Sequence, residues 1–324
     1  MKTIMADIKS GNFHSCYLIY GEESYLVRQY TDNLIDAITG RDDSMNFSRF
    51  QGKNVDENAV IDLAETLPFF AEHRLILVED SGLFKSSPDK LPDYIAELPE
   101  SSIIIFREQA VDKRNRLYKA VNKNGYVCEM KKQTEATLTK WILSQVKKEK
   151  KQITQQALSL FLEKSGTDMN VIKNELEKLF SYTLDRNAIE IEDIEAVCSS
   201  RMENHIFDMV DAISNGNSKK AFTLYADLVQ LKEPAGRILY LISRQYSILL
   251  KAKELREEGH DIASIASRLS LPEFAVRKHV RLAASFEVGQ LKRAIEKCIE
   301  AEESFKTGRI EDRLALETLI VELT

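Results

Sequence analysis

Two apolar runs decide the fold of this chain: LILV at residues 75–78 and IIIF at residues 103–106. Neither run alternates with polar residues, which is typical of central strands of a parallel sheet that is covered on both faces. Three further strand-like runs lie in the same part of the chain. The sequence therefore predicts five strands, over residues 17–20, 46–50, 74–78, 102–107 and 126–130.

The segments between these strands place apolar residues three and four positions apart, which is the period of a helix that covers a sheet. These segments span residues 22–38, 56–66, 89–98 and 113–122. Strands that alternate with helices favour parallel pairing through helical crossovers. The N-terminal region is therefore predicted to be an α/β domain with a parallel sheet.

After about residue 134 the strand pattern stops and helical patterns follow one another. A small helical unit is predicted from segments 138–149, 154–164, 168–182 and 190–198. The tripeptide Ser199-Ser200-Arg201 is interpreted as a linker to a last domain of longer helices. The sequence thus predicts three domains, residues 1–135, 136–200 and 201–324, of which the last two are all-α.

Composition excludes several classes of protein. The 324 residues carry 45 Lys and Arg against 51 Asp and Glu, so the chain is not a polycation that binds nucleic acid over its whole surface. A hydrophobic content of 44% with only 12 Gly and 6 Pro predicts an ordered chain. No apolar run reaches the length of a membrane span or of a secretory signal, so we expect a cytoplasmic protein that makes no contact with a membrane.

The cysteines and histidines do not form a metal-binding motif. Cys16, Cys128, Cys198 and Cys298 lie far apart in the chain, so we interpret them as free, buried thiols. None of the five histidines stands in a ligand spacing such as HExxH, and surface or capping roles are expected for them. These histidines are His14, His73, His205, His260 and His279. We therefore predict no metal site.

A strand that ends at Tyr20 and is followed by Gly21-Glu22-Glu23-Ser24 stands where an ATPase of this architecture would hold its phosphates. A phosphate cradle needs converging backbone N–H groups, a lysine, and a serine or threonine on magnesium. This loop has one glycine and two carboxylates, which would repel phosphate. We interpret it as a tight turn with acids near a helix N-terminus, and expect it to bind no nucleotide cofactor.

The run LILVED at residues 75–80 looks like the magnesium-binding strand of the same ATPases. Acids also occur where any strand enters water, and no phosphate cradle accompanies Glu79 and Asp80. A nucleophile elbow of the GxSxG type is absent from the sequence as well. The sequence therefore offers no catalytic constellation.

The stretch TLPFFAE at residues 66–72 precedes the strand at 74–78. Pro68 ends the preceding helix and keeps Leu67 extended, so the adjacent Phe69 and Phe70 fall on a short connection. Two neighbouring aromatic rings on such a connection do not readily share one core. The pattern leaves two interpretations open: a staple of the core, or an apolar peg for a partner's pocket.

Residues 261–280 have the pattern of a helix-turn-helix, with Pro272 in the turn and a basic second helix. Arg277, Lys278 and Arg281 would form the positive edge toward DNA. Any close-packed helical hairpin needs the same small apolar spacing. Packing within a helical domain is therefore the alternative interpretation.

Four segments, taken in order, make the chain resemble the delta subunits of bacterial DNA polymerase III. They are YLIYGEE at 17–23, TLPFF at 66–70, RILYLISRQY at 237–246, and FKTGR at 305–309 with ALE at 315–317. The resemblance spans nearly the whole chain, and it rests on the order and spacing of the segments together with the degenerate phosphate loop. It implies a component of the clamp loader.

The resemblance also implies an architecture and a set of partners. Such subunits have an AAA+-like N-terminal domain that has lost ATP binding, a small helical lid domain and a helical collar domain. They assemble with the delta-prime and gamma/tau subunits, open the sliding clamp (the beta subunit) and act on primer-template DNA through the complex. By resemblance, Leu67, Phe69 and Phe70 would enter a hydrophobic pocket of the clamp, with Pro68 shaping the loop.

In this family residues 261–280 would lie in the collar, which favours subunit packing for them and leaves open whether the basic residues also face DNA. Two other functions remain as alternatives. One is an ATP-binding relative of the gamma subunit that would use Glu79 and Asp80 on magnesium. The other is a regulator that binds DNA through the helix-turn-helix pattern.

Overall fold

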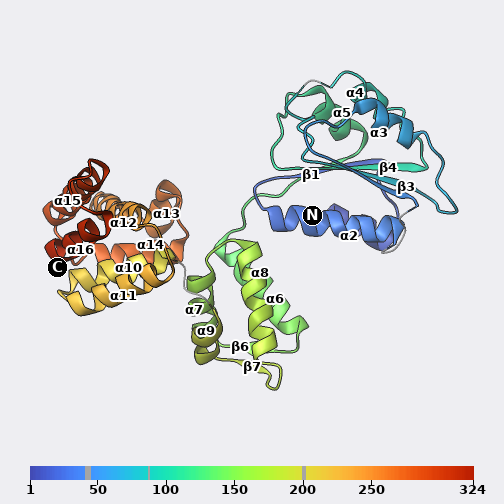
Figure 1. Ribbon diagram of the computed structural model, residues 1–324. Coiled ribbons are helices and arrows are strands. Elements are labelled where there is room, and N and C mark those ends of the chain that lie inside the picture. The colour runs from blue at the N-terminus through green and yellow to red at the C-terminus, as the bar shows by residue number, and fades with distance from the viewer. Residues whose placement is uncertain (41–44, 87, 199–201) are drawn as a thin grey trace. The chain divides into compact units, whose positions relative to one another are not determined.

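The computed structural model describes residues 1–40, 45–86, 88–198 and 202–324. The chain forms two compact units, residues 1–133 and 134–324 (Figure 1). The predicted linker at 199–201 lies outside the described residues. The division into three domains at 135 and 200 therefore stays a prediction.

The first unit is built on one sheet of five parallel strands, in the spatial order β2-β3-β4-β1-β5. Every residue of β1 and β3 is buried, and β4 is buried except at Arg107. This confirms the interpretation of the two apolar runs as central strands. The bounds are Cys16–Tyr20 for β1, Phe47–Gln51 for β2, Arg74–Glu79 for β3, Ser102–Glu108 for β4 and Tyr126–Glu129 for β5.

Helices cover both faces of this sheet (Figure 1). One face packs against α2 (Ser24–Thr39), and the other against α3 (Glu57–Ala64), α4 (Leu91–Tyr94) and α5 (Arg116–Asn124). The predicted helix at 89–98 is confined to the four residues of α4, which has Pro92 in its first turn and Pro99 shortly beyond it. An N-terminal helix, α1 (Lys2–Ser10), was not predicted.

The second unit begins with α6 (Glu135–Lys148), α7 (Gln155–Ser165), α8 (Met169–Tyr182) and α9 (Ile191–Val197). Side chains of Thr134, Thr154 and Asp168 cap the first three of these helices by accepting backbone N–H groups. Two strands of two residues each, β6 (Gln152–Ile153) and β7 (Ala188–Ile189), pair in parallel. The expectation that no strand follows residue 134 was therefore wrong, because two residues are too few to show a period.

Longer helices complete this unit around a core that includes Ile242, Tyr246 and Leu249 of α12. The four cysteines of the chain are all free and buried, as predicted. Within the described ranges, none of the helices combines the length and apolar character that crossing a membrane requires. The helices are α10 (Met202–Ser214), α11 (Ser218–Gln230), α12 (Ala235–Glu257), α13 (Ile262–Leu269), α14 (Glu273–Ala283), α15 (Val288–Lys306) and α16 (Asp312–Leu323).

Candidate functional site

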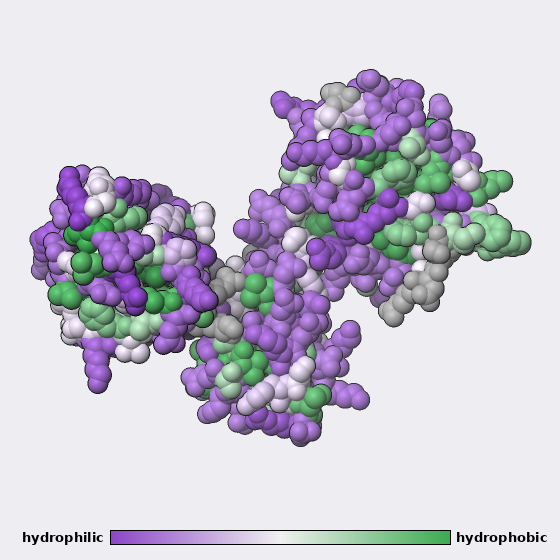
Figure 2. Space-filling model, viewed as in Figure 1, coloured by the Kyte–Doolittle hydropathy of each residue, from purple (hydrophilic) through white to green (hydrophobic). Residues whose placement is uncertain are grey.

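The loop of residues 66–72 exposes an apolar cluster. Leu67 is 76% exposed, Phe69 is 55% exposed and Phe70 is 96% exposed, while Pro68 is half-buried. These values contradict the core-staple interpretation, since a staple would bury at least one ring. Figure 2 shows apolar atoms projecting from the edge of the first unit, where the α3–β3 connection leaves the sheet in Figure 1.

Two buried polar side chains fix the backbone of this loop. The side chain of Asn46, only 2% exposed, accepts the Phe69 N–H at 2.6 Å and donates to the Phe69 carbonyl at 3.0 Å. Arg74, also buried, donates from Nε to the Thr66 carbonyl at 2.9 Å and from a terminal nitrogen to the Leu67 carbonyl at 3.2 Å. The loop is therefore held in one conformation although its side chains face solvent.

The two rings contact each other edge to face, with centroids 4.7 Å apart. Phe70 has a φ of +49°, in the left-handed region that a bulky residue seldom adopts. Such a conformation costs of order 1 kcal/mol and persists only where the surroundings enforce it. The hydrogen bonds from Asn46 to the preceding residue supply that constraint.

The sequence did not identify Asn46 and Arg74 as functional residues. Each stands at the first position of a predicted strand, and both side chains are polar although they are buried. Because strands β2 and β3 pair in parallel, these two positions lie at the same edge of the sheet as the loop. A polar residue at the amino end of a predicted strand was thus the available signal, and only at Arg74 did it precede a continuous apolar run.

The predicted degenerate phosphate loop lies at the opposite, carboxyl edge of the sheet. The backbone N–H of Glu23 donates to the Met130 carbonyl at 3.0 Å, and a Cβ at Gly21 would stand 2.2 Å from the same oxygen. Glycine is therefore required by the close approach of the chain beyond β5. Glu22 and Ser24 are exposed.

The cavity beside Gly21 and Ser24 has a volume of about 110 Å³. Pockets for small-molecule ligands typically measure about 300–1,000 Å³. The cavity at this edge is therefore too small for a nucleotide.

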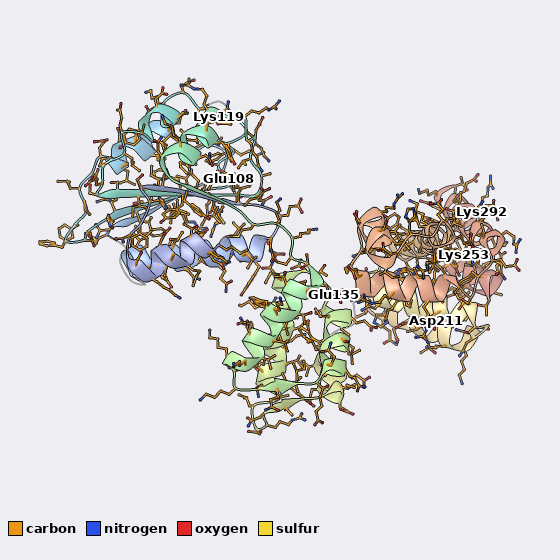
Figure 3. All side chains as sticks on the ribbon, turned by 180° about the vertical axis from the view of Figure 1, so that it is seen from behind. Glu108, Lys119, Glu135, Asp211, Lys253 and Lys292 are labelled. Atoms are coloured by element: carbon orange, nitrogen blue, oxygen red, sulfur yellow. The ribbon has the colours of Figure 1, made fainter. Side chains whose placement is uncertain are left out.

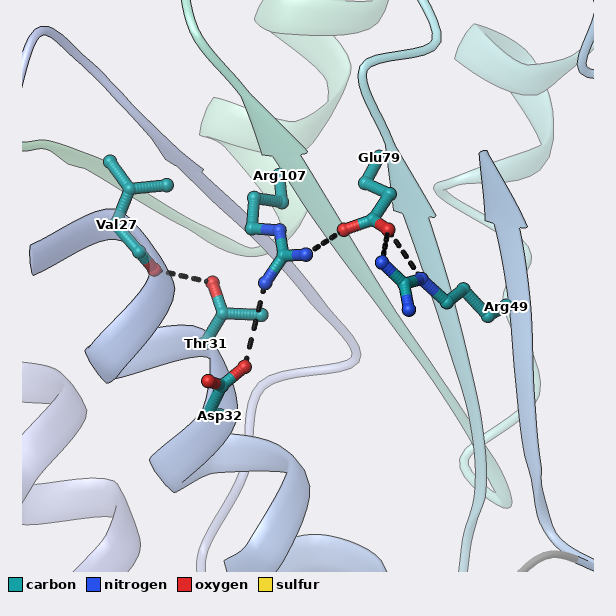
Figure 4. A network of polar contacts seen from close by, with 6 residues as sticks. All are labelled: Val27, Thr31, Asp32, Arg49, Glu79 and Arg107. Carbon is teal, nitrogen blue, oxygen red and sulfur yellow. Dashed lines mark hydrogen bonds and ion pairs between the residues drawn. The ribbon is translucent and has the colours of Figure 1, made fainter. Parts of the chain in front are cut away.

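Glu79, the acid of the magnesium-like run, is buried and paired with two arginines (Figure 4). Arg49 of β2 and Arg107 of β4 each contact one of its carboxylate oxygens. Arg107 also contacts Asp32 of α2 at 3.4 Å, and burial raises the pKa of Asp32. Because guanidinium groups engage both oxygens of Glu79, the arrangement does not favour the alternative in which this carboxylate holds magnesium.

The neighbouring acid at this edge is also engaged. Glu108, labelled in Figure 3, accepts the backbone N–H of Ser81 at 2.9 Å and its hydroxyl at 2.5 Å. Burial raises the pKa of Glu108, and the hydrogen bonds from Ser81 oppose that rise. Glu79 and Glu108 are thus occupied by contacts within the chain, whereas Asp80 is exposed.

The helix-turn-helix pattern forms a packed hairpin of α13 and α14, with Ser270 at a φ of +53° in the turn. Its basic residues are largely engaged by acids of the same unit. Arg277 contacts Glu135 at 3.2 Å, and Lys278 contacts Glu163. Arg281 is exposed. A contact of these three residues with DNA stays a prediction.

His279 of α14 does not have the expected surface role. It is buried, with Nδ1 2.7 Å from the Ala275 carbonyl and Nε2 3.2 Å from the Gln245 side-chain oxygen on α12. Burial lowers the pKa of His279. The surface interpretation was wrong for this residue because its neighbours in space come from a helix more than 30 positions away.

Comparisons with known proteins agree with this architecture. Family models described as DNA polymerase III, delta subunit, and DNA polymerase III delta subunit, C-terminal domain, match residues 17–131 and 203–323. The DNA polymerase III subunit delta of Bacillus subtilis is 26% identical, over 99% of this chain and 96% of the relative. A probable DNA polymerase III subunit delta of Aquifex aeolicus is 20% identical, over 76% of this chain and 73% of the relative.

A solved structure, the Bacillus subtilis DNA clamp loader delta protein, aligns with a TM-score of 0.67 at 25% identity, over 99% of this chain and 98% of that one. The fold is an α/β unit on a five-stranded parallel sheet followed by a helical unit, and ion pairs and hydrogen bonds within the chain span the carboxyl edge of the sheet. The chain belongs to the family of DNA polymerase III delta subunits, which are components of the clamp loader.

Proposed function

We propose that this protein binds the sliding clamp through Leu67, Pro68, Phe69 and Phe70, and holds the ring open for loading on primed DNA. The observation that carries the proposal is the exposure of three large apolar side chains on a loop whose backbone is fixed from the buried side by Asn46 and Arg74. An exposed apolar cluster of this kind is typical of a docking site for a protein partner.

The rigid loop favours docking because little conformational entropy remains to be lost. Burying one aromatic side chain contributes roughly 1.5–3 kcal/mol, so Phe69 and Phe70 together would supply much of the affinity of a micromolar complex. A contact of this type opens the ring only if the open clamp binds more tightly than the closed clamp. The loop would therefore recognise a clamp surface that changes shape between the two states.

The proposal includes no catalytic step in this chain and no ATP cofactor. Glu79 is engaged by Arg49 and Arg107, and the loop at Gly21 packs against the backbone of Met130. ATP chemistry would belong to the gamma/tau subunits, which would join this protein and delta-prime through the collar. Primer-template DNA would be reached through that complex, in the cytoplasm.

A binding measurement on a matched pair of variants tests the proposal. The double variant Phe69→Ala, Phe70→Ala should weaken binding to the immobilised sliding clamp by about two orders of magnitude or more. Its melting temperature should stay close to that of the wild type, because both rings are exposed. The control Leu231→Ala, Tyr240→Ala removes two other exposed apolar side chains, and should leave clamp binding unchanged.

Two results would contradict the proposal. Unchanged clamp affinity in the folded Phe69→Ala, Phe70→Ala variant would exclude the loop as the docking element. A similar loss in both double variants would show that the effect comes from general loss of apolar surface.

A further inference from the structure

The C-terminal part of α6 and the turn after it carry a cluster of lysines without acidic partners. Residues 140–151 contain five lysines and a single acid, Glu149. Lys140, Lys147, Lys148 and Lys150 are exposed, and within the described part of the chain none of the four makes an ion pair. We call these four residues the α6 lysine surface.

The helical period places these side chains away from the core. Helix α6 buries Leu138, Ile142 and Val146. Lys140 and Lys147 are two turns apart and share the opposite face, about 10 Å from each other along the axis. Lys148 follows, and Lys150 occupies the next turn with a φ of +56°. The α6 lysine surface thus lies on the solvent side of the helix and of the turn that follows it.

The helix dipole does not explain the whole stripe. Cations in the last turn of a helix complement its negative end, which accounts for Lys147 and Lys148. Lys140 lies about two turns earlier, and Lys150 lies beyond the helix. Like charges at this spacing repel one another. Binding of an external anion would therefore lower the electrostatic repulsion that remains in the folded chain.

Several other cations of this unit are engaged within the chain. Lys173 contacts Glu177 at 2.9 Å and Lys178 contacts Glu175 at 2.7 Å. Lys278, one of the residues predicted to face DNA, contacts Glu163. Of the three basic residues predicted to face DNA, Arg277 and Lys278 are paired and Arg281 is exposed. Exposed cations that make no ion pair are therefore more closely spaced on α6 than on the basic helix of the helix-turn-helix pattern.

We infer that the α6 lysine surface binds the phosphate backbone of duplex DNA, independently of sequence. Lysines that meet phosphates release condensed counterions, and this supplies affinity without reading bases. A duplex is the fitting partner because its charge density is high and because the family is one of DNA polymerase III subunits. The inference does not depend on the proposed contact between the 66–72 loop and the clamp.

Anisotropy of a short fluorescent duplex, titrated with the full-length protein at several salt concentrations, tests this inference. The test variant carries Gln at Lys140, Lys147, Lys148 and Lys150. Its duplex affinity at low salt should fall at least tenfold, and the slope of log affinity against log salt should become shallower by about 3 to 4. Clamp binding should be retained, which separates this result from a failure of the proposed function.

A control variant carries Gln at four exposed lysines elsewhere, Lys219, Lys220, Lys232 and Lys292, the last labelled in Figure 3. The control has the same net charge as the test variant, and Lys232 resembles Lys150 in having a positive φ, of +58°. The control should change duplex affinity less than twofold. The inference is overturned if the wild type does not bind the duplex, if both variants lose affinity equally, or if polyglutamate binds the same lysines as tightly as DNA.

Discussion

Asn46 engages both hydrogen-bonding groups of the Phe69 backbone from 23 positions away in the sequence. Its amide supplies one donor and one acceptor in the positions that the turn requires. Arg74 adds two donors to the preceding carbonyls. At the scale of single residues, the presentation of two exposed rings therefore depends on two side chains that are themselves buried.

Replacing Asn46 with Ala should loosen the loop and weaken clamp binding about tenfold, because the ordering of the rings would then have to occur on docking. The free energy of unfolding should fall by about 1–3 kcal/mol, since two backbone groups lose their partner. Asn46→Asp keeps the hydrogen-bond acceptor but loses the donor. Its clamp affinity and its free energy of unfolding should therefore lie between those of Asn46→Ala and the wild type. Calorimetric clamp titration and thermal unfolding measure both effects, and wild-type affinity in Asn46→Ala would exclude the bracing role.

At the scale of elements, Glu79 links three strands and a helix through charge. Arg49 comes from β2, Glu79 from β3 and Arg107 from β4, while Asp32 of α2 contacts the last of these. The carboxyl edge of the sheet is thus closed by contacts of the chain with itself. The same edge would hold a nucleotide in an ATPase of this architecture.

Changing Glu79 to Gln should lower the free energy of unfolding by about 1–3 kcal/mol. This loss is smaller than the roughly 3–5 kcal/mol expected when one partner of a fully buried ion pair is removed, because Arg49 is half exposed. Neither the wild type nor this variant should bind ATP in a calorimetric titration, since neither has a phosphate cradle. Micromolar ATP binding by the wild type would contradict the closed-edge interpretation.

His279 links α14 to α12 and gives the second unit a pH dependence. Because its pKa in the folded protein lies below the ordinary value of 6.5, the unfolded chain binds more protons between the two values. The stabilising contribution of the neutral ring is present above about pH 6.5 and is lost as the pH falls. Thermal unfolding of His279→Gln should depend less on pH below 6.5 than that of the wild type. Parallel pH profiles would contradict this role.

For the molecule as a whole, the buried cluster of the sheet and that of helices α10 to α16 are separate, so clamp binding should survive removal of the last predicted domain. Removing residues 201–324 should abolish entry into the clamp loader while the remaining chain still binds the clamp. Size-exclusion chromatography with the delta-prime and gamma/tau subunits measures the first effect, and clamp titration the second. Entry of the truncated chain into the complex would show that the collar assignment is wrong.

Local patterns in the sequence were sufficient to predict the class of fold. Continuous apolar runs identified the buried strands, three- and four-residue periods identified the helices, and the composition of residues 21–28 excluded a phosphate cradle. These signals are local, because strand and helix periods and turn chemistry act over a few neighbouring residues. The same limit explains the missed two-residue strands β6 and β7, which are too short to form a period.

Which side of the loop faces solvent depends on contacts between residues that are far apart in the chain. A pair of phenylalanines after a proline is compatible with a core or with a surface, and the contacts that select the surface come from Asn46 and Arg74. Likewise Glu79 meets Arg49 and Arg107 from positions about 30 residues away, and Arg277 meets Glu135 from 142 residues away. Such pairs carry no local pattern, because the free energy that forms them arises only when the folded chain brings distant side chains together.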